Sequence, residues 1–336
     1  MPLLRSPSLV RAALALAVVV PGFLAQAGAA DANQPSTQTP APSATTTTDG
    51  GTPKSSSGHT WELPALTVEG EPASPYKSDE LVGEYAQPRW VTSRRFAEVR
   101  AYVLAAGEID AEYWIFIDTP TRHDVDEAKA TGAPRPKTVI TQQYEIEMGL
   151  GHHIQADVYQ VYIKNGSNAA GDNAAGPEET KFEVRYALAD WDKIWGNPTL
   201  YAEWIQEQHD ADQAEFKLLL AKQIVPGWFA ATNFVYQVKT GNDRETSHEW
   251  NTGVSYALID NILDVGAEDH IGYVTARRED GTGGYTKDHD QWNEFLLGPS
   301  IRWHPVPNAH IDLTVFGGLT DHTSSSETVL ITGWEF

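Results

Sequence analysis

The chain ends with Glu327-Thr-Val-Leu-Ile-Thr-Gly-Trp-Glu-Phe336, a stretch in which two kinds of residue alternate. One face carries Phe336 and Trp334, and the other carries the two glutamates together with Ile331 and Val329. About ten alternating residues with one aromatic and apolar face make a strand long enough to cross a membrane. The edge strand of a soluble β-domain shows the same pattern, so the rest of the chain has to decide between the two.

Segments that alternate with a period of two recur after Ile109. They predict strands at roughly 109–119, 138–149, 152–163, 181–189, 199–208, 214–224, 228–239, 246–258, 263–278, 288–303, 309–319 and 327–336. Their number is about twelve, and single-chain bacterial outer-membrane barrels have an even number of strands. Phe336, with an aromatic residue two positions earlier, resembles the end of the closing strand of such barrels. We therefore predict an all-β fold, a transmembrane antiparallel up-and-down β-barrel over residues 109–336.

The predicted connections alternate in length. Those after odd-numbered strands are mostly longer and polar, as in 120–137 and 279–287, whereas turns such as Leu150-Gly151 and Val225-Pro-Gly227 are tight. Residues 190–198 are a longer exception on the tight side. Outer-membrane barrels have short periplasmic turns and longer extracellular loops, so we expect both termini of the mature chain in the periplasm.

Each predicted strand has one apolar and one polar face, as where Tyr144 and Ile146 alternate with Glu145 and Glu147. A charge in the hydrocarbon layer costs about 2–4 kcal/mol at the midplane, so the polar faces are predicted to line the lumen. The predicted lumen acids are Glu112, Asp118, Glu145, Glu147, Asp157, Glu183, Glu203, Glu207, Glu215, Glu249, Asp264, Glu268, Glu294 and Asp312, and the bases are Arg185, Lys217, Lys239, Arg278 and Arg302. Acids outnumber bases, which predicts an acidic lumen that prefers cations if it is open. The alternative is a narrow lumen filled by paired side chains.

The amino end has the pattern of a secretory signal peptide over residues 1–30. Arg5 and Arg11 precede an apolar run over 12–24, and the small residues 25–30 supply a cleavage site. Residues 31–60 are rich in Thr, Ser and Pro and cannot bury enough apolar surface to fold, which predicts a disordered linker. Export and a barrel together predict the outer membrane of a Gram-negative-type bacterium. The expected partners are outer-membrane lipid, the barrel-assembly machinery and small-molecule solutes.

Residues 61–108 form a periplasmic segment before the predicted barrel. It includes Arg94-Arg95-Phe96 and Arg100-Ala-Tyr-Val-Leu104. This segment is expected to cap the lumen, to plug it or to supply a short extra strand, and the sequence leaves the three open. Leu66-Thr-Val-Glu69 resembles the energy-coupling box of TonB-dependent receptors, but those receptors have a far larger barrel, so no energy-coupling partner is expected.

Composition excludes several classes of protein. Removal of residues 1–30 leaves 22 Lys and Arg against 46 Asp and Glu, a net charge of −24, which argues against nucleic acid as a partner. The absence of Cys excludes disulfides and thiolate metal sites. No G-x-S-x-G, H-E-x-x-H, P-loop or G-x-G-x-x-G motif occurs. We expect no cofactor and no enzymatic activity.

Histidines beside acids recur in the predicted long loops. They are His123-Asp124, His209-Asp210, His248-Glu249, Asp288-His289-Asp290 and Asp321-His322. If these groups converge at one rim, they suit a divalent transition metal, or a His–Asp couple that activates water in an outer-membrane hydrolase. Surface loops are rich in such residues in any case, so these are weak candidates and we predict no firm metal site.

The chain from about 138 to 336 resembles the transporter-type outer-membrane barrels assigned to the MetA pathway of phenol degradation. The resemblance rests on Glu183-Val-Arg-Tyr-Ala-Leu188, Trp250-Asn-Thr-Gly-Val-Ser-Tyr-Ala-Leu258 and Phe336. It implies an outer-membrane channel, identifies no substrate and supplies no catalytic residues. The predicted function is passive passage of small solutes. The alternatives are a closed barrel with a structural role or a ligand- or metal-binding role at its loops, and, third, an outer-membrane hydrolase.

Overall fold

The computed structural model describes residues 77–165, 176–280, 282 and 284–336. The predicted signal peptide, the linker and residues 61–76 lie outside the described residues, as does part of the predicted 164–180 loop.

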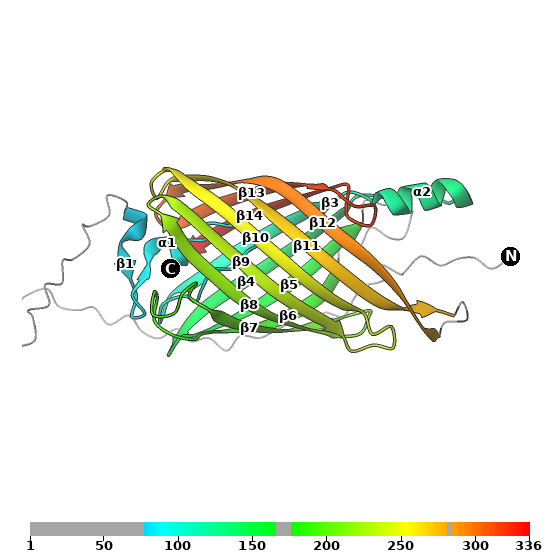
Figure 1. Cartoon of the computed structure of the whole chain (residues 1–336), viewed down its shortest axis with the longest axis horizontal. Coiled ribbons are helices and arrows are strands. Elements are labelled where there is room, and N and C mark those ends of the chain that lie inside the picture. Colours follow the sequence, from blue (N-terminus) through cyan, green and yellow to red (C-terminus); the bar gives the residue numbers. More distant parts are fainter. Residues whose placement is uncertain (1–76, 166–175, 281, 283) are drawn as a thin grey trace, which may run out of the picture. The chain divides into compact units, whose positions relative to one another are not determined.

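Twelve strands form one closed barrel, preceded by a short irregular segment (Figure 1). In chain order the elements are η1 (Lys77–Asp79), β1 (Leu81–Val82), β2 (Gln87–Pro88), α1 (Arg89–Thr92), β3 (Ile109–Asp118), α2 (Arg122–Thr131), β4 (Val139–Gly151), β5 (Ile154–Asn165), β6 (Gly176–Ala187), β7 (Thr199–Glu207), β8 (Gln213–Val225), β9 (Trp228–Lys239), β10 (Thr246–Ile259), β11 (Leu263–Glu279), β12 (Tyr285–Val306), β13 (Ala309–Gly318) and β14 (Ser326–Glu335). Each barrel strand pairs antiparallel with its sequence neighbours, and β14 pairs with β3 to close the barrel. The predicted fold is confirmed.

The closure uses the stretch at the end of the chain. β14 pairs with β3 from Glu327 opposite Asp118 to Glu335 opposite Asp110. The backbone N–H of Phe336 then donates to the carbonyl of Ile109, at 2.8 Å. The alternation of this stretch therefore reflects its position in the wall, because every second residue of a barrel strand faces outward.

Strand boundaries differ from prediction mainly beyond the barrel rim. β12 runs from Tyr285 to Val306, longer than the predicted 288–303, and it pairs with β11 out to Glu279 opposite Tyr285. In Figure 1 this hairpin extends past the neighbouring strands. Polar residues cover both faces there, because no apolar face is needed outside the bilayer, and the period-two signal is lost.

The two faces of the wall separate by polarity. Tyr144, Ile146 and Phe182 are about half exposed on the outside, whereas Glu145 and Glu183 are almost fully buried on the inside. Outward aromatic and aliphatic groups suit lipid, and inward polar groups avoid it.

The turns at one end are tight. At the β4–β5 turn both His152 (φ 53°) and His153 (φ 65°) have positive φ, as a two-residue hairpin turn of the I′ type requires. The 188–198 connection at this end is longer because Trp191 reaches back over the lumen, where its backbone N–H donates to the carbonyl of Tyr85.

The other end carries α2, which the sequence did not predict. Thr121 caps its start by accepting a hydrogen bond from the Asp124 N–H at 3.0 Å, and Gly132 ends it with a φ of 73°. Only Ala128 of this helix is buried, so it lacks the apolar stripe that reveals a helix in a sequence. No helix in the described part of the chain is long or apolar enough to cross a membrane.

Candidate functional site in the barrel lumen

The predicted lumen residues of β4 to β13, with the exception of Arg278, point to the inside of the barrel. The most buried, each at most 4% exposed, are Glu145, Glu147, Asp157, Glu183, Arg185, Asp264, Glu268, Arg302 and Asp312. Glu203 is also buried, and Lys217, Glu249 and Glu294 are partly exposed.

Some of these charges pair within the wall. Arg185 contacts Glu183 and lies 3.1 Å from Asp157. Lys217 lies 2.7 Å from Glu215. Both members of each pair come from barrel strands, so these side chains fill part of the lumen and neutralise one another without a partner from another segment.

Arg278 is a correction to the predicted lumen set. It lies on the part of β11 that extends past the rim, more than half exposed, and its guanidinium donates to Asp290 at 2.6 Å. Lys239, near the same end of the barrel, pairs with Asp210 at 3.1 Å.

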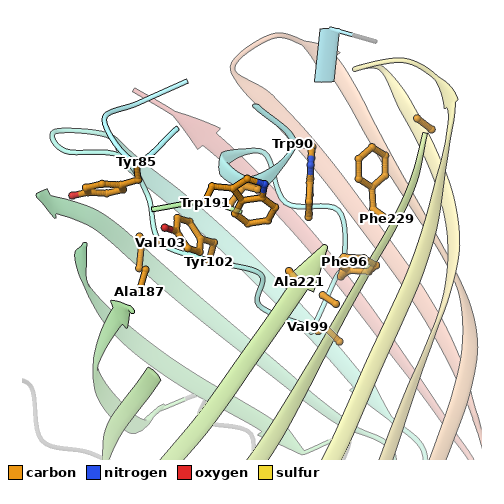
Figure 2. Close-up of a cluster of buried hydrophobic side chains, with 13 residues drawn as sticks. Tyr85, Trp90, Phe96, Val99, Tyr102, Val103, Ala187, Trp191, Ala221 and Phe229 are labelled. Atoms are coloured by element: carbon orange, nitrogen blue, oxygen red, sulfur yellow. The ribbon is translucent and has the colours of Figure 1, made fainter. Parts of the chain in front are cut away.

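The short-turn end of the lumen is filled by residues 89–104, which we call the plug (Figure 2). Trp90 packs edge-on against Trp191, with ring centroids 5.3 Å apart, and lies 4.9 Å from Phe229. Tyr102 also meets Trp191 edge-on, at 5.2 Å. These rings join side chains of the plug to side chains of β9 and of the β6–β7 connection.

The tip of the plug reaches a second cluster inside the barrel. Ala97 packs there with five wall residues: Trp114, Leu296, Phe316, Val329 and Ile331. The inner face of β14 is apolar at this depth, where Val329 and Ile331 belong to the same buried cluster as Ala97 of the plug. Alternation places Val329 and Ile331 on the same face as Glu327 and Glu335 but does not explain why two apolar residues lie on the inner face.

Three arginines of the plug meet wall carboxylates. Arg100 donates to Glu145 and to Glu147, each at 2.7 Å. Arg94 lies 3.1 Å from Glu112 and also contacts Glu147. Arg95 contacts Asp264. The plug therefore supplies positive charge to acids that the wall itself only partly neutralises.

Backbone groups of the plug are also held by the wall. The N–H groups of Ala97 and Glu98 donate to the carboxylate of Glu268, at 2.9 and 3.1 Å. The N–H of Leu104 donates to Gln155 at 2.7 Å. These bonds satisfy an irregular chain inside the lumen, where unpaired backbone groups are costly.

Gly253 on β10 makes room for the plug. A Cβ at this position would overlap the ring of Phe96, 2.8 Å from Cε1 and 3.0 Å from Cγ. Any larger residue at this position would push Phe96 away from the wall.

The plug contains groups with shifted pKa values. Burial lowers the pKa of Arg95 to about 10, although Asp264 opposes this shift, so the group stays charged at neutral pH. Burial disfavours the charge on Arg100, but Glu145 and Glu147 outweigh it and hold its pKa well above the ordinary value. Burial, and then the charge of Glu268, raise the pKa of Glu98 to about 7.

The loop histidines do not gather into one site. The rings of His123 and His322 lie 4.2 Å apart, and the side chains of His123 and Asp124 group with that of Glu127 on the exposed α2. His209 lies 3.7 Å from Glu178, away from that group. Three of the remaining candidates are acids with a basic partner. Asp210 pairs with Lys239, Asp290 pairs with Arg278, and Asp321 lies 3.6 Å from Arg122. The fourth, His289, is exposed. Basic partners thus occupy three of the acids that were considered as metal ligands.

The roles of Arg94, Arg95 and Arg100 were not assigned from the sequence. A signal was present, because three arginines occur within seven residues of a strongly acidic chain, immediately before the first strand. The sequence does not show that this segment folds back into the lumen, where the three arginines meet acids of the wall.

Comparison with protein families identifies the chain. Residues 155–326, just over half of the chain, match the family model described as "Putative MetA-pathway of phenol degradation". The chain belongs to this family. The match begins in β5 and ends at β14, so it covers most of the barrel wall and leaves out the plug.

Solved structures share the barrel. The outer membrane channel from Pseudomonas putida F1 is 11% identical, with a TM-score of 0.50 over 70% of this chain and 98% of that chain. The NanC porin is 12% identical, with a TM-score of 0.41 over 69% of this chain and 99% of that chain. LpxR from Salmonella typhimurium is 10% identical, with a TM-score of 0.37 over 66% of this chain and 99% of that chain. No curated protein sequence matches the chain. The fold is that of outer-membrane β-barrels.

Proposed function

We propose that this protein is an outer-membrane channel for the passive passage of small solutes, closed by its own plug and cation-preferring when the plug leaves. The observation that carries the proposal is that Arg94, Arg95 and Arg100 of the plug neutralise carboxylates of the wall.

In a barrel whose lumen is permanently filled, the inward acids and bases of the wall can pair with one another and need no partner from another segment. Here Glu145 and Asp264 each have an ion-pair partner in the plug, and Glu268 binds the plug's backbone. Withdrawal of the plug would leave these carboxylates facing water in a confined path. Fixed charges of one sign in such a path concentrate counter-ions, which here are cations.

The plug is joined covalently to the barrel wall at one end. It joins β3 through residues 105–108, and its remaining contacts with the wall are non-covalent. Buried ion pairs contribute little net stability, because rehydrating both partners offsets the lost attraction. The aromatic cluster around Trp90 and Trp191 therefore supplies most of the attraction that keeps the plug in place.

The aromatic cluster also favours a second candidate function. A plug that never leaves would make this a closed barrel with a structural or ligand-binding role. The two candidates differ in one property, because only the channel passes current.

The test is recording from the full-length protein in planar bilayers across a salt gradient. We expect openings whose reversal potential indicates cation preference. Replacement of Glu145, Glu147 and Glu183 together by Gln should move that potential toward zero, most clearly at low salt, where screening is weakest.

The matched control neutralises three exposed acids of α2, Asp124, Asp126 and Glu127. It removes the same formal charge outside the lumen and should leave the reversal potential nearly unchanged. Anion preference would contradict the proposal, and a complete lack of current would support the closed barrel.

A further inference from the structure

Three neighbouring strands at the seam of the barrel hold a buried acid–histidine group. Asp110 and Glu112 lie on β3, and His310 lies on β13, with β14 between them. We propose that Asp110, Glu112 and His310 bind one divalent transition-metal ion, with Zn²⁺ as the best-fitting probe. This proposal does not depend on channel activity.

The potential ligand atoms face one another, and two of the three lack hydrogen-bond partners. Nε2 of His310 lies 3.3 Å from Oε1 of Glu112 and 3.6 Å from Oδ2 of Asp110. Neither that Nε2 nor that Oε1 makes a hydrogen bond, and both side chains are fully buried. Ligands bound tetrahedrally to Zn²⁺ at 2.0–2.1 Å lie about 3.3–3.4 Å apart, so the spacing of this pair fits a shared ion.

The surrounding residues orient these ligands. Nδ1 of His310 lies 2.6 Å from Oδ2 of Asp312, which leaves Nε2 free to face the site. A carboxylate behind a metal-binding imidazole is the usual arrangement, because it fixes the tautomer and raises the basicity of the ligand. On the other side, the indole Nε1–H of Trp114 donates to Oε2 of Glu112 at 2.8 Å, so Oε1 points toward the histidine.

Gly333 lets the imidazole cross the intervening strand. It lies opposite His310 on one side of β14 and opposite Glu112 on the other. A Cβ on Gly333 would overlap Nε2 of His310 and lie 2.6 Å from its Cε1. The glycine therefore provides the space in which His310 reaches the acids of β3.

Charge and donor type select the ion. The site adjoins the carboxylate of Asp312, and Arg94 and Arg302 are the arginines that the structure places against these acids in the described residues. One imidazole with two carboxylates suits Zn²⁺ or Mn²⁺, whereas Mg²⁺ and Ca²⁺ favour oxygen ligands alone. The competing structure is an ion pair of protonated His310 with the same acids, which needs no metal.

The experiment measures Zn²⁺ retained by the full-length protein in detergent after chelator treatment, reloading and desalting. Every variant carries His123→Ala and His322→Ala to remove the exposed imidazole pair, and folding is checked by the heat-dependent mobility of the barrel on gels. We expect about one retained Zn²⁺ per chain, lost in His310→Ala and in Glu112→Gln.

His304→Ala is the matched control, because His304 is another buried imidazole, whose ring centroid lies 6.2 Å from that of His310. It should keep the ion. Asp312→Asn should retain the fold and weaken Zn²⁺ affinity by about 10–100-fold, as loss of an orienting carboxylate does.

A second readout is the temperature at which the folded band disappears. An ion that links β13 to β3 stabilises the closing seam, so added Zn²⁺ should raise this temperature in the reference protein and leave it unchanged in His310→Ala. A folded reference protein that retains no Zn²⁺, or equal retention by His310→Ala, overturns the proposal and favours the metal-free ion pair.

Discussion

Arg100 shows how single residues keep the lumen closed. Its guanidinium donates to Glu145 and Glu147 of β4 and, at 3.1 Å, to the hydroxyl of Tyr159 of β5. The side chain is nearly excluded from solvent. Removing one member of such a buried group leaves charges without partners, and this costs about 3–5 kcal/mol.

Arg100→Ala should therefore loosen the plug while the barrel stays folded. We expect a larger open fraction in single-channel recordings, with unchanged heat-dependent mobility on gels. Arg89→Ala is the control, since Arg89 is also at the plug but pairs with Glu80 in an exposed position, where a pair contributes about 0–1 kcal/mol. Equal effects of the two substitutions would count against the role of the buried pairs.

Glu98 should make release of the plug depend on pH. Burial and then Glu268 raise its pKa from 4.5 to about 7 in the docked plug, although a hydrogen bond with Glu327 of β14 opposes the shift. The docked state thus binds the proton more tightly than a released plug does. Protonation of Glu98 therefore stabilises the docked state relative to the released state. This stabilisation is complete below about pH 4.5 and is lost as pH rises through about 7.

We predict that the open fraction increases roughly tenfold or more between about pH 5 and pH 8. Glu98→Gln keeps a neutral group at this position and should flatten that dependence while favouring the closed state. A pH profile that is the same with and without Glu98 would show that another group is responsible.

At the scale of elements, the plug depends on space reserved for it in the wall. Gly253→Ala should displace Phe96, and overpacking of this kind costs about 1–3 kcal/mol. We expect a larger open fraction in recordings of this variant. Gly317→Ala is the matched control, because the nearest heavy atom to a Cβ there is 3.9 Å away.

The elements differ in how far the sequence predicted them. The strands were predicted well, because lipid on one side and polar contacts on the other impose a strict period of two. α2 was missed because its exposed position requires no apolar stripe. For the plug, composition showed a dense basic segment, but its position depends on contacts with residues such as Glu268 and Phe229, which are far away in sequence.

The candidate sites follow the same logic. Inward acids such as Glu145 and Asp157 could be placed from alternation. The grouping of Asp110 and Glu112 with His310 could not, because it depends on which strands close the barrel and on the gap left by Gly333. The proposed convergence of loop histidines required a rim geometry that the sequence does not encode in any local pattern.

At the scale of the whole molecule, the two ends of the barrel differ, and this predicts its orientation. Because the chain has no Cys, single cysteines can report exposure. Glu127→Cys on α2 should react with a membrane-impermeant maleimide on intact cells, whereas Asn308→Cys in the β12–β13 turn should react only after lysis. The opposite result would invert the topology.

The central claim is that the plug closes the lumen and can leave it. A disulfide between Phe96→Cys and Gly253→Cys tests it most directly. A Cβ on Gly253 lies 3.0 Å from Cγ of Phe96, so the two Cβ atoms are at most about 4.5 Å apart, within the range for a disulfide.

The measurement is the current of single channels of this double variant before and after addition of a reductant, with Phe96→Cys alone as the control. We predict that the oxidised channel stays closed, that reduction produces cation-preferring openings, and that the control does not respond to the reductant. Oxidised channels that conduct as well as reduced ones would contradict the account.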